Sequence, residues 1–429
     1  MTLQLSDEEA SMLAGEQGAG VAMAMRMIVT LSRTLGAETL IPITSAHIDS
    51  CLFHGQAGLD FAVRLVELGT EVRVPTTLNT GSVDLLHPGL IRTESADERA
   101  VLSGGRALME AYLALGCRPT WTCAPYQLPQ RPGFGEHIAW AESNAIVFAN
   151  SVLGARTDRY GDFLDIAAAV TGRAPYSGLH LDGARRGQIV FDCTSIPDDV
   201  LRSDITYPLL GYIVGSRCQT RNPVLVGLPA EVTEDQLKAF GAAAASSGGV
   251  ALFHVVGVTP EAPTLAAALQ DSEPMGRHDV TPALLQRARR ELSTVTAGRL
   301  DAVSIGTPHA SYEECRELAE LLGDGPELHP GFTFYVSTGR AVLERLRAEG
   351  QAAVLERYGV RVVVDTCTYV TSILSPDLKV VMTNSGKWAH YAPANLGIDV
   401  VLGSMQECVA SARAGQIRID DHWPEESGR

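Results

Sequence analysis

The chain has 429 residues, of which 45% are hydrophobic and 20% are charged, as is typical of a folded globular protein. One small core cannot account for this length, so two or three packed units are expected. The net charge of −16 argues against a nucleic-acid partner, because phosphate binding needs clustered lysine and arginine. A small anionic ligand is still compatible with this charge.

The first residues show no basic region followed by an apolar core, and no run approaches the roughly 20 apolar residues of a membrane span. We therefore expect a cytoplasmic protein that does not bind a membrane. Eight cysteines are spread singly along the chain, without a CxxC or CxxH pair. This spacing disfavours both a disulfide framework and a structural zinc site.

In chain order, alternating helix and strand patterns predict an α/β fold with largely parallel sheets. Ser6 and Glu9 form a capping box, which predicts a helix from there to about Leu35. The later elements are strands over 40–44 and 72–74, helices over 61–68 and 97–116, a mixed segment over 138–153, strands over 224–228 and 250–257 with a helix from about 233 between them, a helix over 286–292, and strands over 302–305, 362–364 and 379–382.

The composition changes between about 194 and 300. We interpret 194–300 as an intervening α/β unit. The parts on either side, 1–193 and 301–429, then form one catalytic α/β region that carries the cysteines of interest.

Cys123 and Cys367 each follow a strand pattern and lie beside Thr, Pro or Tyr. A third segment, 303–311, has the same strand-then-polar form without a cysteine. Ligands of parallel α/β sheets bind beyond the carboxyl ends of the strands, and thiolates favour soft metals and iron–sulfur clusters. The pattern therefore predicts a thiolate-held iron centre, with buried structural thiols as the alternative. The remaining cysteines are interpreted as structural: Cys51, Cys117, Cys193, Cys218, Cys315 and Cys408.

Ser385, Gly386 and Lys387 follow another strand pattern, where backbone N–H groups and an ammonium can hold an anion. The alternative is a surface turn with an extended lysine.

Two histidines and an arginine are further candidates. His47 and His309 are candidates for acid/base or ligand roles, although a single histidine is more often a hydrogen-bonded core residue. Arg156 is placed to clamp a carboxylate or to form a structural ion pair.

Several stretches together resemble the large, catalytic part of aconitase X, a divergent branch of the aconitase superfamily. The resemblance covers nearly the whole chain, and the combination is more specific than any single motif. The stretches are 44–47 (TSAH), 75–79 (PTTLN), 122–126 (TCAPY), 139–145 (AWAESNA), 149–157 (ANSVLGART), 253–262 (FHVVGVTPEA), 306–309 (GTPH), 365–367 (DTC) and 384–387 (NSGK).

The resemblance implies a multi-domain, aconitase-like arrangement of βαβ units and a hydro-lyase that uses iron or an iron–sulfur cluster. It implies cis-3-hydroxy-L-proline as substrate, with Δ1-pyrroline-2-carboxylate as product. Mevalonate 5-phosphate dehydratase is the alternative within the family. A non-catalytic iron-binding or scaffold subunit and a zinc hydrolase are the alternatives outside it.

Archaeal members of the family look as if they hold a [4Fe–4S] cluster with three cysteines. Thr307 stands at the position of the middle cysteine. The departure disfavours a three-thiolate [4Fe–4S] cluster. It favours a [2Fe–2S] cluster or a mononuclear iron on Cys123 and Cys367, and it favours hydroxyproline as substrate.

No swivelling small domain of the family is recognisable, so we expect a separate small subunit that completes the site and supplies a serine base. The resemblance implies catalytic roles for His47, His309 and Lys387. The residues expected to bind the small carboxylate substrate are Ser45, Asn79, Ser151, Arg156, Ser311, Ser385 and Gly386.

Overall fold

The computed structural model describes residues 3–323 and 325–420, and it divides the chain into two compact units, Met1–Arg186 and Gly187–Arg429. Both units combine helices with parallel sheets, which confirms the predicted α/β class. Among the described residues, no helix is both long enough and apolar enough to cross a membrane.

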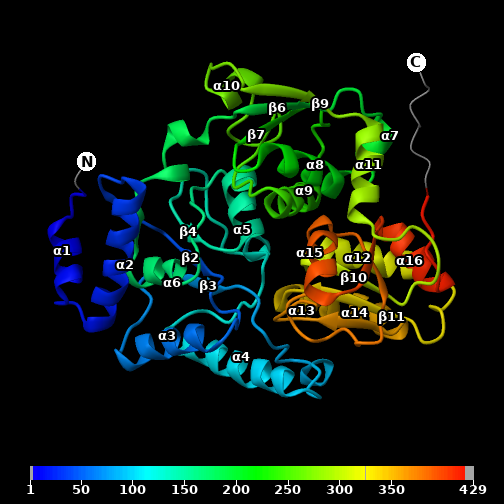
Figure 1. Cartoon of the computed structure of the whole chain (residues 1–429), viewed down its shortest axis with the longest axis horizontal. Helices are drawn as coiled ribbons and strands as arrows, with labels where there is room; N and C mark the ends of the chain where they lie inside the picture. Colours follow the sequence, from blue (N-terminus) through cyan, green and yellow to red (C-terminus); the bar gives the residue numbers. More distant parts are fainter. Residues whose placement is uncertain (1–2, 324, 421–429) are drawn as a thin grey trace. The chain divides into compact units, whose positions relative to one another are not determined.

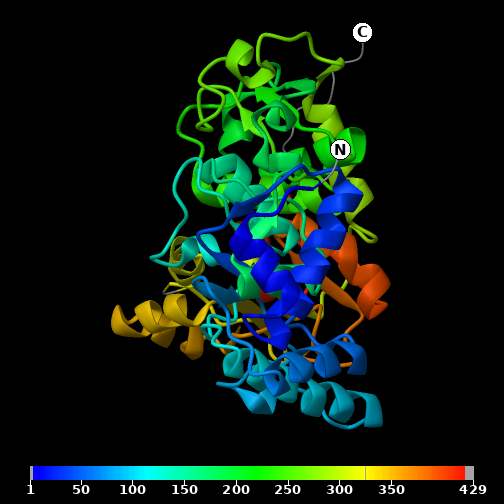
Figure 2. The same cartoon turned by 90° about the vertical axis from the view of Figure 1, so that its left-hand side faces the viewer.

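The first unit contains a three-stranded parallel sheet in the order β3-β2-β4 and an antiparallel pair, β1-β5. Figure 1 shows α3 and α4 side by side, and the turned view in Figure 2 agrees. The elements are α1 (Asp7–Ala14), α2 (Ala19–Leu35), β1 (Leu40–Pro42), β2 (Ala46–Ile48), α3 (Gln56–Glu67), β3 (Thr76–Leu78), α4 (Ala96–Ala114), β4 (Ala139–Trp140), α5 (Ser143–Phe148) with a π-helical turn (Ala149–Leu153), α6 (Leu164–Thr171) and β5 (Arg173–Pro175), with 3₁₀ turns at Pro88–Leu90, Pro125–Gln127, Gly178–His180 and Asp182–Arg185.

The second unit contains two parallel sheets, ordered β8-β7-β6-β9 and β12-β11-β10-β13-β14. Its elements are β6 (Ile189–Asp192), α7 (Asp198–Arg202), α8 (Thr206–Cys218), β7 (Pro223–Val226), α9 (Glu234–Ser247), β8 (His254–Val255), α10 (Leu265–Leu269), β9 (Gly276–Asp279), α11 (Pro282–Leu292), β10 (Ala302–Ala310), α12 (Tyr312–Leu322), β11 (Thr333–Thr338), α13 (Arg340–Ala348), α14 (Gln351–Arg357), β12 (Val360–Val363), β13 (Val380–Thr383), α15 (Gly386–Leu396), β14 (Asp399–Leu402) and α16 (Met405–Ala414).

The capping box at Ser6 and Glu9 is present, but the single helix predicted to run to about Leu35 was wrong. The chain forms α1 and α2 instead, because Gly15 and Gly18 both adopt positive φ angles, of 90° and 106°. A left-handed glycine ends α1 by offering its N–H to the last carbonyls of the helix.

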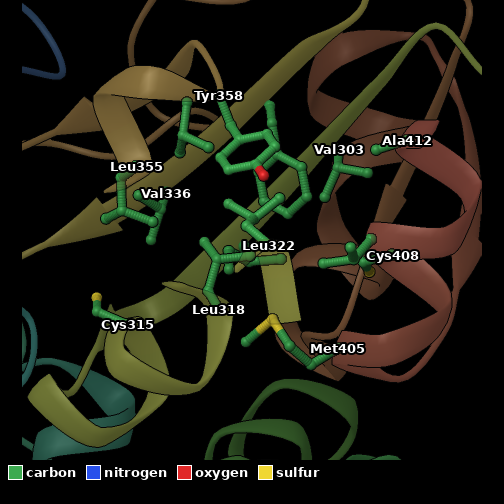
Figure 3. Close-up of a cluster of buried hydrophobic side chains, with 14 of the residues drawn as sticks. Val303, Cys315, Leu318, Leu322, Val336, Leu355, Tyr358, Met405, Cys408 and Ala412 are labelled. Carbon is green, nitrogen blue, oxygen red and sulfur yellow. The ribbon is translucent and has the colours of Figure 1, made fainter. Parts of the chain in front are cut away.

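A buried apolar cluster packs helices α12, α14 and α16 against the five-stranded sheet (Figure 3). Val303 and Val336 come from neighbouring central strands, and Leu318 and Leu355 come from two of the helices. The packing fixes β10 at the centre of the sheet, where all nine of its residues are buried. The carboxyl end of β10 is therefore held rigidly among its neighbours.

One predicted strand is shifted along the chain. Val72–Val74 is not a strand, because the N–H groups of Val72 and Arg73 bond to carbonyls of helical segments at Leu115 and Ala169. The strand lies instead at Thr76–Leu78, paired with β2. The region around His47 also differs from the prediction: a further strand, β2, follows the predicted 40–44 strand, so His47 lies within a strand of the parallel sheet rather than after one.

Candidate active site

Polar side chains gather at the carboxyl edge of the three-stranded sheet in the first unit. His47 lies in β2, Asp49 directly follows β2, and Asn79 directly follows β3. Glu142 follows β4 and caps α5, and its φ angle of 75° is unusual for a residue with a side chain. Because the three strands run parallel, their carboxyl ends meet at one edge, where α/β proteins bind ligands.

His47 is fully buried and uncharged at neutral pH. Burial lowers the pKa of His47 to about 3, against a smaller opposite effect of the Glu142 charge. Its Nδ1 lies 2.8 Å from Thr77 Oγ1, and Nε2 has no hydrogen-bond partner in the described part of the chain. A neutral imidazole of this kind can accept a proton or a hydrogen bond, but it cannot act as a cationic acid at pH 7.

Asp49 is a candidate that the sequence argument missed. Burial raises the pKa of Asp49 to about 7, and the charge of Glu142 adds to this shift. Asn79 Nδ2 donates to Asp49 Oδ1 and lowers the pKa by a smaller amount. A carboxyl group with a pKa near 7 suits acid/base work. Its position directly after the strand that carries His47 could have identified Asp49, by the same strand-end argument that selected the cysteines.

Cys123 lies in a loop whose conformation is fixed by buried polar contacts. The Asn144 side chain donates to the Cys123 carbonyl at 2.7 Å and accepts from the Tyr126 hydroxyl at 2.9 Å. Two residues before the cysteine, Trp121 has a φ angle of 42°. A left-handed Trp is strained, so the loop is held by its surroundings.

The loop that carries Cys367, in the second unit, also has a left-handed residue before its cysteine. Asp365, again two residues before the cysteine, has a φ angle of 63°. Its carboxylate accepts two hydrogen bonds from Arg340, at 2.5 and 2.6 Å. His309 Nε2 donates to the Thr366 carbonyl at 3.0 Å. A bidentate arginine and a histidine therefore hold the two residues before Cys367.

The strand ends of the second unit meet through hydrogen bonds between side chains. Thr368 Oγ1 lies 2.7 Å from Ser304 Oγ in β10 and accepts from Trp388 Nε1 in α15 at 3.0 Å. Ser385 Oγ donates to the Thr307 carbonyl and accepts the Trp388 N–H. Thr307, His309, Cys367 and Ser385 are thus brought to one edge of the sheet, as the strand-end rule predicts.

A cavity of about 580 Å³ opens at this edge of the second unit. Thr307, Ser385 and Gly386 line it together with charged residues such as Lys238 and Glu314. Cys367 and His309 are not among the lining residues. The cavity therefore reaches the Ser385 loop but not the cysteine.

Several predicted substrate ligands have structural partners. Arg156 donates to the His180 carbonyl and forms an ion pair with Asp182. Of the two roles considered for Arg156, this is the structural ion pair. Ser311 caps α12 and donates to Asp235 at 2.7 Å. Ser385 caps α15. Of the others, Ser45 is half-buried before β2, Ser151 is buried in the π-helical turn, and Lys387 is buried in the first turn of α15.

Cys123 belongs to the first unit and Cys367 to the second, and a thiolate is a ligand type that iron centres accept. Within the described residues, no three His, Cys, Asp or Glu side chains gather in a way that could hold a metal. Cys123 and Cys367 are both buried: Cys367 follows β12, whereas Cys123 lies in the loop between α4 and β4 and the strand predicted before it is not formed. Thr307 Oγ1, where the family resemblance led us to expect a third thiol in relatives, is buried without a hydrogen-bond partner in the described part of the chain.

Acid/base side chains at the carboxyl edge of a parallel sheet, in a chain that also carries buried thiols in loops, are typical of metal-assisted enzymes of small molecules. Sequence models of protein families identify the family. The model of the aconitase X first domain matches residues 2–183. The models of the second and third domains match residues 187–290 and 300–414. The chain belongs to the aconitase X family, which confirms the resemblance found in the sequence.

Individual proteins show the same relationship. The chain is 42% identical to a cis-3-hydroxy-L-proline dehydratase from Pseudomonas aeruginosa, over 95% of this chain and 69% of that protein. It is 35% identical to a phosphomevalonate dehydratase large subunit from Thermococcus kodakarensis, over 96% of this chain and 100% of that one. The crystal structure of aconitase X from the same organism, in its holo-form, superimposes with a TM-score of 0.85 at 34% identity, covering 96% and 100% of the two chains.

Proposed function

We propose that the chain is the large subunit of a hydro-lyase that converts cis-3-hydroxy-L-proline into Δ1-pyrroline-2-carboxylate and water. One observation carries the choice of substrate: identity to the cis-3-hydroxy-L-proline dehydratase is 42%, against 35% to the phosphomevalonate dehydratase large subunit. The dehydratase names of both relatives support elimination of water as the reaction class.

The reaction removes a proton from the carbon that bears the carboxylate and a hydroxyl from the neighbouring ring carbon. The resulting enamine tautomerises to Δ1-pyrroline-2-carboxylate, so one water leaves for each substrate. An iron centre, when bound, supplies a Lewis acid that weakens the bond to the departing hydroxyl. Lys387 and the N–H groups at the start of α15 bind the substrate carboxylate and stabilise the developing negative charge.

In this proposal Asp49 does the acid/base work, and the two histidines have supporting roles. Asp49, with its pKa near 7, exchanges a proton at neutral pH, and neutral His47 accepts a hydrogen bond. His309 positions the Cys367 loop through Thr366. A small partner subunit supplies the remaining base, which is supported by the alignment over the whole of a protein named a large subunit.

Turnover tests the substrate. The chain is purified anaerobically with its small subunit, loaded with iron and sulfide, and offered cis-3-hydroxy-L-proline or mevalonate 5-phosphate while the product is quantified. We expect product from the hydroxyproline alone. Product from mevalonate 5-phosphate alone would establish the alternative substrate, and no product with stoichiometric iron would support a non-catalytic subunit.

Iron content tests the ligands independently of turnover. We propose that Cys123 and Cys367 each supply one thiolate to a [2Fe–2S] cluster or a mononuclear iron. Cys367→Ser and Cys123→Ser are expected to lose bound iron and its visible absorption while far-UV circular dichroism is unchanged. Cys315→Ser is the control, because Cys315 lies in the apolar cluster of Figure 3. Iron retained in either ligand variant contradicts the assignment.

A further inference from the structure

Two buried hydrogen-bond acceptors at the β2–β3 edge have no donor in the described part of the chain. They are His47 Nε2 and Asn79 Oδ1, on side chains that are 0% and 3% exposed. Buried polar atoms of this kind are costly unless a ligand or a water satisfies them. Their position at the carboxyl edge of parallel strands favours a ligand.

We assign both orphan atoms as acceptors from the contacts of His47 and Asn79. Thr77 Oγ1 can donate to the Ala46 carbonyl at 3.4 Å, which leaves the hydroxyl oxygen to accept from His47 Nδ1–H at 2.8 Å. With the proton on Nδ1, the neutral ring presents a lone pair at Nε2. The side-chain nitrogen of Asn79 donates to the Asp49 carboxylate, so the side-chain oxygen of Asn79 lies beside that carboxylate.

The charges around these two acceptors are negative. The charges that act most strongly on Asp49 are those of Glu142, Asp162 and Asp165. Asp165 is satisfied internally by N–H groups of Asp49 and Ser50 at 2.8 and 3.0 Å. Asp49 itself accepts from Asn79, a neutral donor. A cation would complement this edge of the sheet.

A ligand that fits carries a positive charge and two N–H donors, which is the description of a secondary ammonium. We propose that His47, Asn79 and Asp49 form the subsite for the ring ammonium group of an α-imino-acid substrate. The proposal rests on the proposed function and deepens it. A ring ammonium donates one hydrogen bond to each orphan acceptor, and Asp49 balances its charge. Mevalonate 5-phosphate has no nitrogen, so the subsite also selects the substrate class.

A pair of unreactive ligands tests the subsite without catalysis. L-Proline has the ring ammonium, whereas (S)-tetrahydrofuran-2-carboxylate has a ring oxygen in its place and no N–H donor. Titration calorimetry on the iron-loaded complex of both subunits is expected to give a Kd for L-proline at least about tenfold lower than for the oxygen analogue. Equal affinities would overturn the proposal and leave the two acceptors to bound water.

Matched histidine variants locate the effect. His47→Phe is expected to reduce the preference for L-proline at least about threefold. His180→Phe is the control, because His180 is equally buried but both of its ring nitrogens have partners, in His137 and Tyr160. An unchanged preference in a folded His47→Phe protein overturns the assignment. If this variant does not fold, the wild-type comparison of the two ligands still decides.

Failure of the subsite and failure of the proposed function give different results. A chain that prefers L-proline but does not dehydrate cis-3-hydroxy-L-proline keeps the subsite and loses the reaction. A chain that dehydrates the hydroxyproline but binds both ring analogues equally keeps the reaction and loses the subsite.

Discussion

At the scale of single residues, the position of a side chain relative to a strand end decides its chemistry more than its residue type. Asp49 and Asp60 are both aspartates of the first unit. Asp49 directly follows β2 and has a pKa raised to about 7, whereas Asp60 lies exposed on α3. Burial makes the charged form of Asp49 unfavourable, so the folded chain holds its proton more tightly than the unfolded chain does.

Replacement of this one carboxyl group is expected to change how stability depends on pH. Between about pH 4 and pH 7 the folded state binds the extra proton, so the Asp49 contribution to stability falls as pH rises and is fully unfavourable above pH 7. The charges of Glu142, Asp162 and Asp165 act in the same direction, and the Asn79 hydrogen bond opposes them.

Above pH 8, Asp49→Asn is therefore expected to exceed wild type in free energy of unfolding by about 1–3 kcal/mol. Near pH 4 the two proteins are expected to be equally stable. Urea titrations at several pH values measure this difference. The exposed Asp60→Asn is the control and is expected to stay within about 0.5 kcal/mol throughout. A pH-independent gain in Asp49→Asn would contradict the raised pKa.

Part of the candidate site could be predicted from the sequence, because residue type and strand-end position are both visible there. Cys367 and the Ser385 loop were selected in this way and do follow strands, whereas Asn79 was named only through the family resemblance. The tautomer of His47 and the raised pKa of Asp49 could not be predicted, since the first depends on Thr77 in β3 and the second on burial and on Glu142 after β4. Likewise, the partners of Arg156 became visible only when its loop was placed beside Asp182.

At the scale of elements, one buried cation joins two helices of the second unit. Lys238 in α9 is 2% exposed, and it donates to Asp235 at 2.9 Å and to Glu314 in α12. Burial alone lowers the pKa of Lys238, but the charges of Asp235 and Glu314 outweigh this effect and raise it above its usual value. The lysine is therefore charged, and its removal leaves two poorly solvated carboxylates.

Lys238→Met is expected to lower the free energy of unfolding by about 3–5 kcal/mol, because it leaves buried charges uncompensated. The double variant Lys238→Met/Glu314→Gln is expected to recover part of this loss, since one of the two charges is then absent. Lys379→Met, at an exposed lysine, is the control with an expected change within about 0.5 kcal/mol. Chemical denaturation of the three variants measures these values, and equal losses in the single and double variants would contradict the charge explanation.

Local capping chemistry was a better guide to the elements than apolar runs were. The capping box of α1 was predicted correctly, and α9 begins where a helix was predicted to start, with Thr233 as its cap. The strand at 72–74 was wrong because its backbone bonds to helical segments, and no local pattern records that choice. Strand register is decided by the partner strand, which lies far away in the sequence.

At the scale of the whole molecule, the chain consists of two compact units with separate cores. Chains of this kind often unfold in more than one step. We expect two transitions in calorimetry. Leu318→Ala, in the buried cluster of the second unit, is expected to cost about 2–5 kcal/mol and to lower only one of them.

Leu113→Ala on α4 is the matched control for that experiment, because Leu113 is 40% exposed and its truncation opens no cavity. We expect its two transition temperatures to stay within about 2 °C of wild type. A Leu318→Ala protein in which both transitions move together would show that the two units unfold as one.

The burial of the six remaining cysteines has a practical consequence for labelling. Burial raises the pKa values of Cys193, Cys218 and Cys315 to about 12, and it raises those of Cys51, Cys117 and Cys408 above their usual range as well. Thiols that stay protonated react slowly with alkylating reagents. Iodoacetamide applied to the native protein at neutral pH should therefore spare all six, so that any label found in a mass spectrum of the treated protein would lie on Cys123 or Cys367.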